Sequence, residues 1–202
     1  MKYRQEYRLH RLLSVSVYTQ TCLDTPSPEV FELRPITLLN CYYKILTKCF
    51  VGLLTPVMGE IICSGQLCSV EKKNILFGIS NITSSLDYVH AHNIPAYIAS
   101  FDMFKAYDRV MLDYLVKVMK AMGFPDKFIS WVLMLHEGAT TCFLLNFLTN
   151  PINVLFSIRQ GDPLSMLLYI IYIEPLLIRI NKLTRVSLSP LWSRKMRIIV
   201  MT

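Results

Sequence analysis

Residues 100–110 read SFDMFKAYDRV and place a carboxylate, that of Asp102, directly after a short apolar run. The preceding residues 96–101 carry no charge and are mostly apolar, which indicates a buried strand. A carboxylate at the edge of a core costs stability unless it is paired, hydrogen-bonded or bound to a metal ion. The stretch therefore has two interpretations: a strand-end aspartate that caps the next turn, or a ligand for a cation.

A second stretch of residues that could bind a ligand, residues 159–165, reads RQGDPLS. Asp162 and Pro163 suit the N-cap and the first position of a helix, and Gly161 lets a ligand or another backbone approach closely. A helix start beside Arg159 suits an anion such as a phosphate. The pattern thus predicts either a well-capped helix without a ligand or a phosphate-binding turn.

The segments around these stretches do not alternate in a regular βαβ order. Helical spacing of apolar residues predicts helices at 41–54 (ended or kinked by Pro56), 74–90, 111–122, 125–136 and 164–180. Strand-like runs occur at 96–101, 140–146, 153–158 and 195–201. The helix at 74–90 carries Ile75, Ile79, Ile82, Leu86 and Val89 on one apolar face. Helices on one face of a mostly antiparallel sheet would give an α+β fold.

Composition narrows the class of protein. Hydrophobic residues make up 53% of the 202 residues, which argues against disorder, and the formal net charge of +7 suits nucleic acid or an anionic membrane surface. The longest uncharged run, residues 138–158, contains three asparagines and Pro151, and the run 166–180 is interrupted by Glu174 and Pro175. We therefore expect no membrane span.

The N-terminus and the cysteines bear on the compartment. A basic start without an apolar core predicts no secretory signal and an intracellular protein. The six cysteines form no CxxC pair and have no histidine at zinc-finger spacing, so we expect reduced thiols and no structural zinc site. The sequence leaves the oligomeric state open.

Taken together, FDxxxAYD at 101–108 and RQGDPLS at 159–165 resemble motifs A and B of reverse transcriptases, most closely those of non-LTR (LINE-like) retrotransposons. Residues 33–40, LRPITLLN, resemble the first fingers motif of that family, and Gln66 matches a glutamine before its second block. The resemblance implies a partial palm-and-fingers (right-hand) polymerase fold without a thumb. It would comprise a poorly determined segment at 1–30, a fingers-like region at 31–95 and a partial palm at 96–202.

The resemblance also implies a role for individual residues. The family copies an RNA template into DNA from a DNA primer and dNTPs, with two Mg²⁺ ions held by carboxylates. Asp102 matches the catalytic metal ligand, and the backbone carbonyl of Met103 would add a second ligand. The residues implied to contact the nucleotide or template are Tyr107 under the sugar, Gln160 and Gly161 in the pocket, and Arg34 near phosphate.

The sequence departs from the family where the metal site should be completed. An apolar run at 197–202 is present, but no Y-x-D-D follows it or occurs elsewhere. The resemblance therefore implies a catalytically incomplete polymerase, and the strand at 195–201 is expected to expose an edge. Two alternatives remain: a small basic membrane-associated protein, and a non-catalytic nucleic-acid-binding remnant that uses Arg34, Lys44, Lys48, Lys72, Lys73, Arg159, Lys195 and Arg197.

Overall fold

The protein is described by a computed structural model that covers residues 15–21, 34–93, 96–144, 149–182, 186–189 and 196–201. The helices are α2 (Cys41–Ile61), α3 (Ile75–Ala91), α4 (Leu112–Ala121), α5 (Asp126–His136) and α6 (Ser165–Lys182). The strands are β1 (Val15–Thr21), β2 (Arg34–Leu38), β3 (Ala96–Phe101), β4 (Thr140–Leu144), β5 (Ile152–Asn153), β6 (Val186–Ser189) and β7 (Met196–Met201). The chain divides into two compact units, residues 1–51 with 107–168 and residues 52–106 with 169–202.

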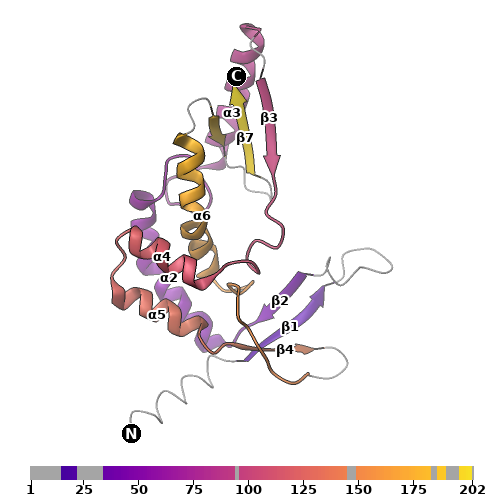
Figure 1. The fold of residues 1–202 in the computed structure, drawn as a ribbon, viewed down its shortest axis with the longest axis vertical. Helices are drawn as coiled ribbons and strands as arrows, with labels where there is room; N and C mark the ends of the chain where they lie inside the picture. The colour runs from indigo at the N-terminus through magenta and orange to yellow at the C-terminus, as the bar shows by residue number, and fades with distance from the viewer. Residues whose placement is uncertain are drawn as a thin grey trace. The chain divides into compact units, whose positions relative to one another are not determined.

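The first unit contains a four-stranded sheet in the order β2-β1-β4-β5 (Figure 1). β1 runs antiparallel to β2 and parallel to β4, and β4 runs antiparallel to β5. β1 lies in the segment for which the sequence pattern predicted no element. The rest of that segment, residues 1–14 and 22–30, lies outside the described residues. The α+β prediction is confirmed in part: helices occur with mostly antiparallel strands, but the described strands form two sheets, and β1 and β4 are parallel.

Helices α4 and α5 of this unit form a hairpin. Gly123 follows α4 at a φ of +82°, which is a conformation that glycine adopts without strain. The residues buried along the two helices are Leu115, Val118 and Met119 on α4, and Ile129, Val132, Leu135 and His136 on α5. The spacing of three and four residues along each helix explains why one face of each is buried.

The second unit contains an antiparallel three-stranded sheet in the order β3-β7-β6. Figure 1 shows β3 and β7 side by side, and their pairing runs from Ala96 with Met201 to Phe101 with Met196. The strand predicted at 195–201 is therefore confirmed as β7, but the expectation that it exposes an edge is wrong. β6, which the sequence pattern did not predict, pairs with its other side and makes β7 the central strand.

Helix α2 continues through Pro56 to Ile61, so the predicted end near residue 54 is wrong. Buried side chains recur every four residues across the proline, at Phe50, Leu54, Met58 and Ile62. A proline removes one helical hydrogen bond to the carbonyl four residues earlier. Both Pro56 and Gly52 are exposed, so water can satisfy that carbonyl while the opposite face stays packed.

One further expectation fails. The predicted strand at 153–158 is reduced to the end of β5, because the N–H groups of Ser157 and Ile158 donate to the carbonyls of Val110 and Tyr107 in a loop. On α3, Gly78 and Ile82 are the buried residues, and Ile79 and Leu86 of the predicted apolar face are exposed. Apolar spacing marks a helix but does not say how much of its face the tertiary structure covers.

Candidate nucleotide and template site

The turn before α6 is built on Asp162. Its Oδ1 accepts a hydrogen bond of 3.1 Å from the N–H of Leu164, and its own carbonyl accepts from the N–H of Ser165 at 3.2 Å. The side chain thus satisfies a backbone donor at the helix start, which the Asp-Pro sequence predicted. The helix itself begins at Ser165, two residues after the expected first position.

Asp162 belongs to a buried polar cluster that also contains Tyr43 and Arg159, and we call these three residues the Tyr43 cluster. The Oη of Tyr43 donates to Oδ2 of Asp162 at 3.4 Å, and the guanidinium carbon of Arg159 lies 4.6 Å from the centre of the Tyr43 ring. Tyr43, Arg159 and Asp162 are 1%, 5% and 6% exposed. The cluster joins the first turns of α2 to the segment that precedes α6, both within the first unit.

Burial governs the ionisation of the cluster. Desolvation raises the pKa of Asp162, while hydrogen bonds from Thr47, Leu164 and Tyr43 and the charge of Arg159 oppose that rise. Desolvation, together with the negative charge of Asp162, also raises the pKa of Tyr43, so this phenol stays protonated and remains a donor. The carboxylate is stabilised by neighbours that must keep their geometry, because a buried charge without partners is costly.

Buried His136 lies within the electrostatic reach of Arg159. Desolvation and, to a smaller extent, the positive charge of Arg159 lower its pKa from 6.5 to about 4, although a hydrogen bond to the carbonyl of Val132 opposes the change. The side chain is therefore neutral at physiological pH. Among the described residues, Nε2 of His136 and Nη1 of Arg159 are buried without a hydrogen-bond partner.

Gly161 lies at the exposed tip of this turn with a φ of +92°. We call residues 159–162 the Gly161 turn. A Cβ on this residue would lie 3.2 Å from the carbonyl oxygen of Thr37, and the N–H of Thr37 donates to the carbonyl of Gln160 at 3.3 Å. Both the backbone angle and the close approach of β2 therefore favour glycine. Gln160 is half-buried beside it, so the structure brings the two predicted pocket residues together at the surface of the first unit.

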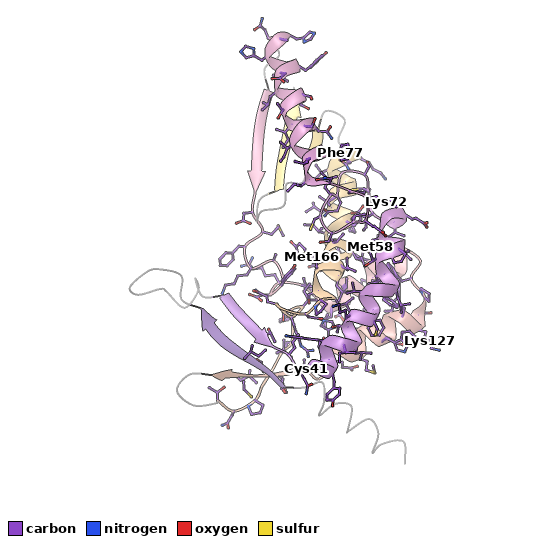
Figure 2. The ribbon with its side chains drawn as sticks, turned by 180° about the vertical axis from the view of Figure 1, so that it is seen from behind. Cys41, Met58, Lys72, Phe77, Lys127 and Met166 are labelled. Atoms are coloured by element: carbon purple, nitrogen blue, oxygen red, sulfur yellow. The ribbon has the colours of Figure 1, made fainter. Side chains whose placement is uncertain are left out.

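Tyr107 is half-buried in the same unit, and its hydroxyl donates to Sδ of Met166 at 3.4 Å. Figure 2 labels Met166, which is the second residue of α6. The carbonyl of Tyr107 accepts from the N–H of Ile158, which directly precedes Arg159. Tyr107 is thus tied by backbone and side chain to the segment on either side of the Gly161 turn.

The predicted metal ligands lie in the second unit. Asp102 directly follows β3 and is exposed, as is Met103. Among the described residues, no group of three or more His, Cys, Asp or Glu side chains could hold a metal ion. These residues therefore do not supply the carboxylate set that two Mg²⁺ ions require. Arg34 begins β2, and its side chain lies outside the described residues.

A buried carboxylate that the sequence did not mark also lies in the second unit. Glu174 is fully buried, and its Oε1 accepts from the N–H of Cys63. Desolvation, followed by the charge and a hydrogen bond of Glu174, raises the pKa of the Cys63 thiol. The Nζ of Lys73 donates to the carbonyl of Cys63 at 2.7 Å. This group fixes the end of α2 against α6 within that unit.

Sequence reasoning also missed Tyr43, Thr47 and His136 as members of the site. The first two share the buried face of α2 with Phe50, so their spacing alone would have predicted a core position and not a polar contact. No local pattern links them to Asp162. Within the described residues, no helix is long and apolar enough to cross a membrane.

Comparison with known proteins gives consistent matches. Residues 27–191 match the family model described as reverse transcriptase (RNA-dependent DNA polymerase). The chain is 31% identical over 150 residues to the Transposon TX1 uncharacterized 149 kDa protein of Xenopus laevis, which covers 74% of this chain and 12% of that protein. It is 31% identical over 85 residues to the retrovirus-related Pol polyprotein from type-1 retrotransposable element R2 of Popillia japonica, covering 42% of this chain and 14% of that protein. The chain thus spans a small part of the length of these curated relatives.

Solved structures resemble the fold. Telomerase from Candida tropicalis in complex with a TWJ fragment of telomeric RNA superposes with a TM-score of 0.61 at 11% identity, over 100% of this chain and 39% of that one. The apo telomerase of the same organism, truncated from its C-terminal domain, gives a TM-score of 0.55 at 13% identity over 94% of this chain and 44% of that one. These likenesses concern the fold alone.

Proposed function

Because this chain belongs to the reverse transcriptase (RNA-dependent DNA polymerase) family and is related to non-LTR retrotransposon proteins, we propose that it binds an RNA template and the incoming nucleotide. In this proposal the Gly161 turn, with Gln160 beside it, contacts template and nucleotide, and Tyr107 packs under the sugar. Arg34 contacts phosphate. Residues 31–95 act as a fingers-like region and residues 96–202 as a partial palm.

The observation that carries the proposal is the shape of the Gly161 turn. The tip is exposed, it takes a backbone angle suited to glycine, and the carbonyl of Thr37 would lie 3.2 Å from any Cβ there. A side-chain-free tip on a rigid base lets a base or sugar approach the backbone closely. The Tyr43 cluster below supplies the rigid base, since all three of its residues are buried and linked.

We propose further that the chain by itself binds nucleic acid but does not copy it. If bound, Mg²⁺ would supply the activation of the primer hydroxyl and the stabilisation of the leaving pyrophosphate. Asp102 and the carbonyl of Met103 would contribute ligands, but the described residues offer no group of three metal-binding side chains. A lone exposed carboxylate offsets little of the cost of removing water from Mg²⁺. Nucleic-acid binding depends instead on the positive charge and the turn, which need no metal.

A binding assay on the full chain tests the first part of this proposal. Fluorescence anisotropy with a labelled single-stranded RNA should give an association constant whose logarithm falls linearly with the logarithm of salt concentration. Gly161→Ala should weaken binding, whereas Gly123→Ala, which also replaces a glycine of positive φ but lies at the end of α4, should not. Absent binding, or equal effects of the two substitutions, would contradict the proposed turn.

A primer-extension assay tests the second part. An RNA template, a DNA primer, dNTPs and Mg²⁺ are incubated with the full chain, and no extension is expected. Extension that disappears in Asp102→Asn would overturn the view that the described residues lack a working metal site. The two assays are independent, so RNA binding can be confirmed whatever the result of the extension assay.

A further inference from the structure

We propose that Tyr43 and Arg159 are positioning residues for the Gly161 turn: they hold it in the conformation that accepts RNA, through the carboxylate of Asp162. This inference deepens the proposed function and rests on it. Neither residue touches substrate in this scheme. Their effect on binding passes through the backbone of residues 160–162.

Tyr43 of α2 contacts the turn directly. The phenol of Tyr43 donates to one carboxylate oxygen of Asp162, while the other oxygen accepts from the N–H of Leu164. A carboxylate bound at both oxygens has a fixed plane, and the backbone of Asp162 is fixed with it. Asp162 directly follows Gly161, so the hydrogen bond from the phenol of Tyr43 also restricts the backbone conformation of Gly161.

Arg159 stacks on the ring of the same tyrosine. Its guanidinium lies over the Tyr43 ring, and its charge favours the ionised form of Asp162. A flat, delocalised cation suits an aromatic face, whereas the compact ammonium of lysine does not reproduce this geometry. The ring of Tyr43 thus fixes the residue that begins the turn, and its hydroxyl fixes the residue that ends it.

On its opposite side, the turn contacts β2. Thr37 of β2 donates its N–H to the carbonyl of Gln160, and its carbonyl lies against Gly161. The turn is therefore held between β2 and the Tyr43 cluster, all within the first unit. Three anchors on four consecutive residues leave the glycine tip exposed but fixed, which is the preorganisation that lowers the entropic cost of binding.

A matched pair of neighbouring tyrosines provides the test. Tyr43→Phe removes only the hydroxyl that reaches Asp162, and Tyr42→Phe makes the same change at a side chain that is 70% exposed. RNA affinity is measured by anisotropy on the full chain. Tyr43→Phe should weaken binding roughly threefold to tenfold, the range expected for the net value of one hydrogen bond, and Tyr42→Phe should leave it unchanged.

A second readout separates positioning from mere stability. The chain has seven glycines, so selective ¹⁵N-glycine labelling gives a simple amide spectrum in which Gly161→Ala identifies the Gly161 signal by its loss. Tyr43→Phe and Arg159→Lys should each shift this signal in the free protein, whereas Tyr42→Phe should not. In a double-mutant cycle with Asp162→Asn, the effect of Tyr43→Phe on RNA affinity should shrink, because both act through one carboxylate.

The outcomes distinguish the two proposals. If the unaltered chain does not bind RNA, the proposed function fails, whatever the spectra show. If it binds RNA but Tyr43→Phe lowers only the melting temperature, with the Gly161 signal and the RNA affinity unchanged, Tyr43 is structural and this inference is overturned. A full effect of Tyr43→Phe in the Asp162→Asn background would overturn the route through Asp162.

Discussion

The hydroxyl of Tyr43 lies 3.4 Å from the carboxylate of Asp162, although 119 residues separate them in the chain. Tyr43 lies in the first turn of α2, which follows the first fingers-like motif, and Asp162 lies in the second of the two motifs that define the family resemblance. The contact is fully buried and joins a neutral donor to a carboxylate. The physical consequences of this arrangement can be measured on the isolated chain.

Acid should destabilise the protein through His136. The pKa of this group is lowered from 6.5 to about 4, so the unfolded chain binds the proton more tightly than the folded one. The contribution of the neutral imidazole to the free energy of unfolding is present above pH 6.5 and is lost as the pH falls toward 4. The loss amounts to on the order of 3 kcal/mol. Urea unfolding between pH 4 and 7 should show this slope in the unaltered chain and a flatter profile in His136→Gln.

Asp162 acts in the opposite sense in the same range. Its pKa is raised in the folded state, so its contribution is present below the unfolded value of 3.8 and is lost as the pH rises through the folded value. Asp162→Asn should therefore steepen the loss of stability in acid.

His90→Gln, a change at an exposed histidine, is the control for the acid titration of His136. Identical profiles for His136→Gln and His90→Gln would contradict the buried, neutral imidazole.

Substitution of glycine should separate backbone strain from steric contact. Gly161→Ala and Gly123→Ala both place a side chain at positive φ, which costs about 1–2 kcal/mol. Gly161→Ala should cost more, because its Cβ meets the Thr37 carbonyl, whereas a Cβ at position 123 meets nothing within 4 Å. Gly52→Ala, in the exposed face of α2, should instead stabilise by roughly 0.5–1 kcal/mol. Chemical denaturation of the three variants measures this order, and an equal loss for the first two would exclude the Thr37 contact.

The thiols should differ in reactivity. Burial and the charge of Glu174 keep the pKa of Cys63 above its usual value of 9.0, so less of it is thiolate at pH 8. Cys41 and Cys49 are exposed. Alkylation by iodoacetamide, followed peptide by peptide with mass spectrometry, should therefore be slower at Cys63 than at these two. Glu174→Gln should speed the reaction at Cys63 and leave Cys41 unaffected, and an unchanged rate at Cys63 would argue against the coupling.

Two lysines on α2 should contribute to the salt dependence of RNA binding. Lys44 and Lys48 are exposed and lie one helical turn apart. If both contact phosphates, Lys44→Ala with Lys48→Ala should reduce the slope of log K against log salt by about 1.4. The matched double substitution of exposed Lys117 and Lys120 on α4 should leave the slope unchanged. Equal slopes for both double variants would identify the α2 lysines as solvated surface charges.

Local sequence patterns predicted much of the fold and the capped turn before α6, but not the buried partners of Asp162. The strands at β3 and β7, the helices from α3 to α6 and the glycine after α4 follow from apolar spacing and from the preference of glycine for positive φ. The pair of motifs predicted the family, which the comparison with known proteins confirmed. The roles of Asp102, Tyr107, Gln160, Gly161 and Arg34 stay predictions.

The sequence by itself therefore determined most of the elements, the capping role of Asp162 before α6 and the identity of the family, because these depend on residues within a few positions of one another. Only the tertiary structure decided that β7 is a central strand, that α2 passes through Pro56 and that Tyr43 meets Asp162. These outcomes depend on which distant surfaces are buried together. A polar contact such as that of Tyr43 looks, in a local window, like any other residue on the buried face of a helix.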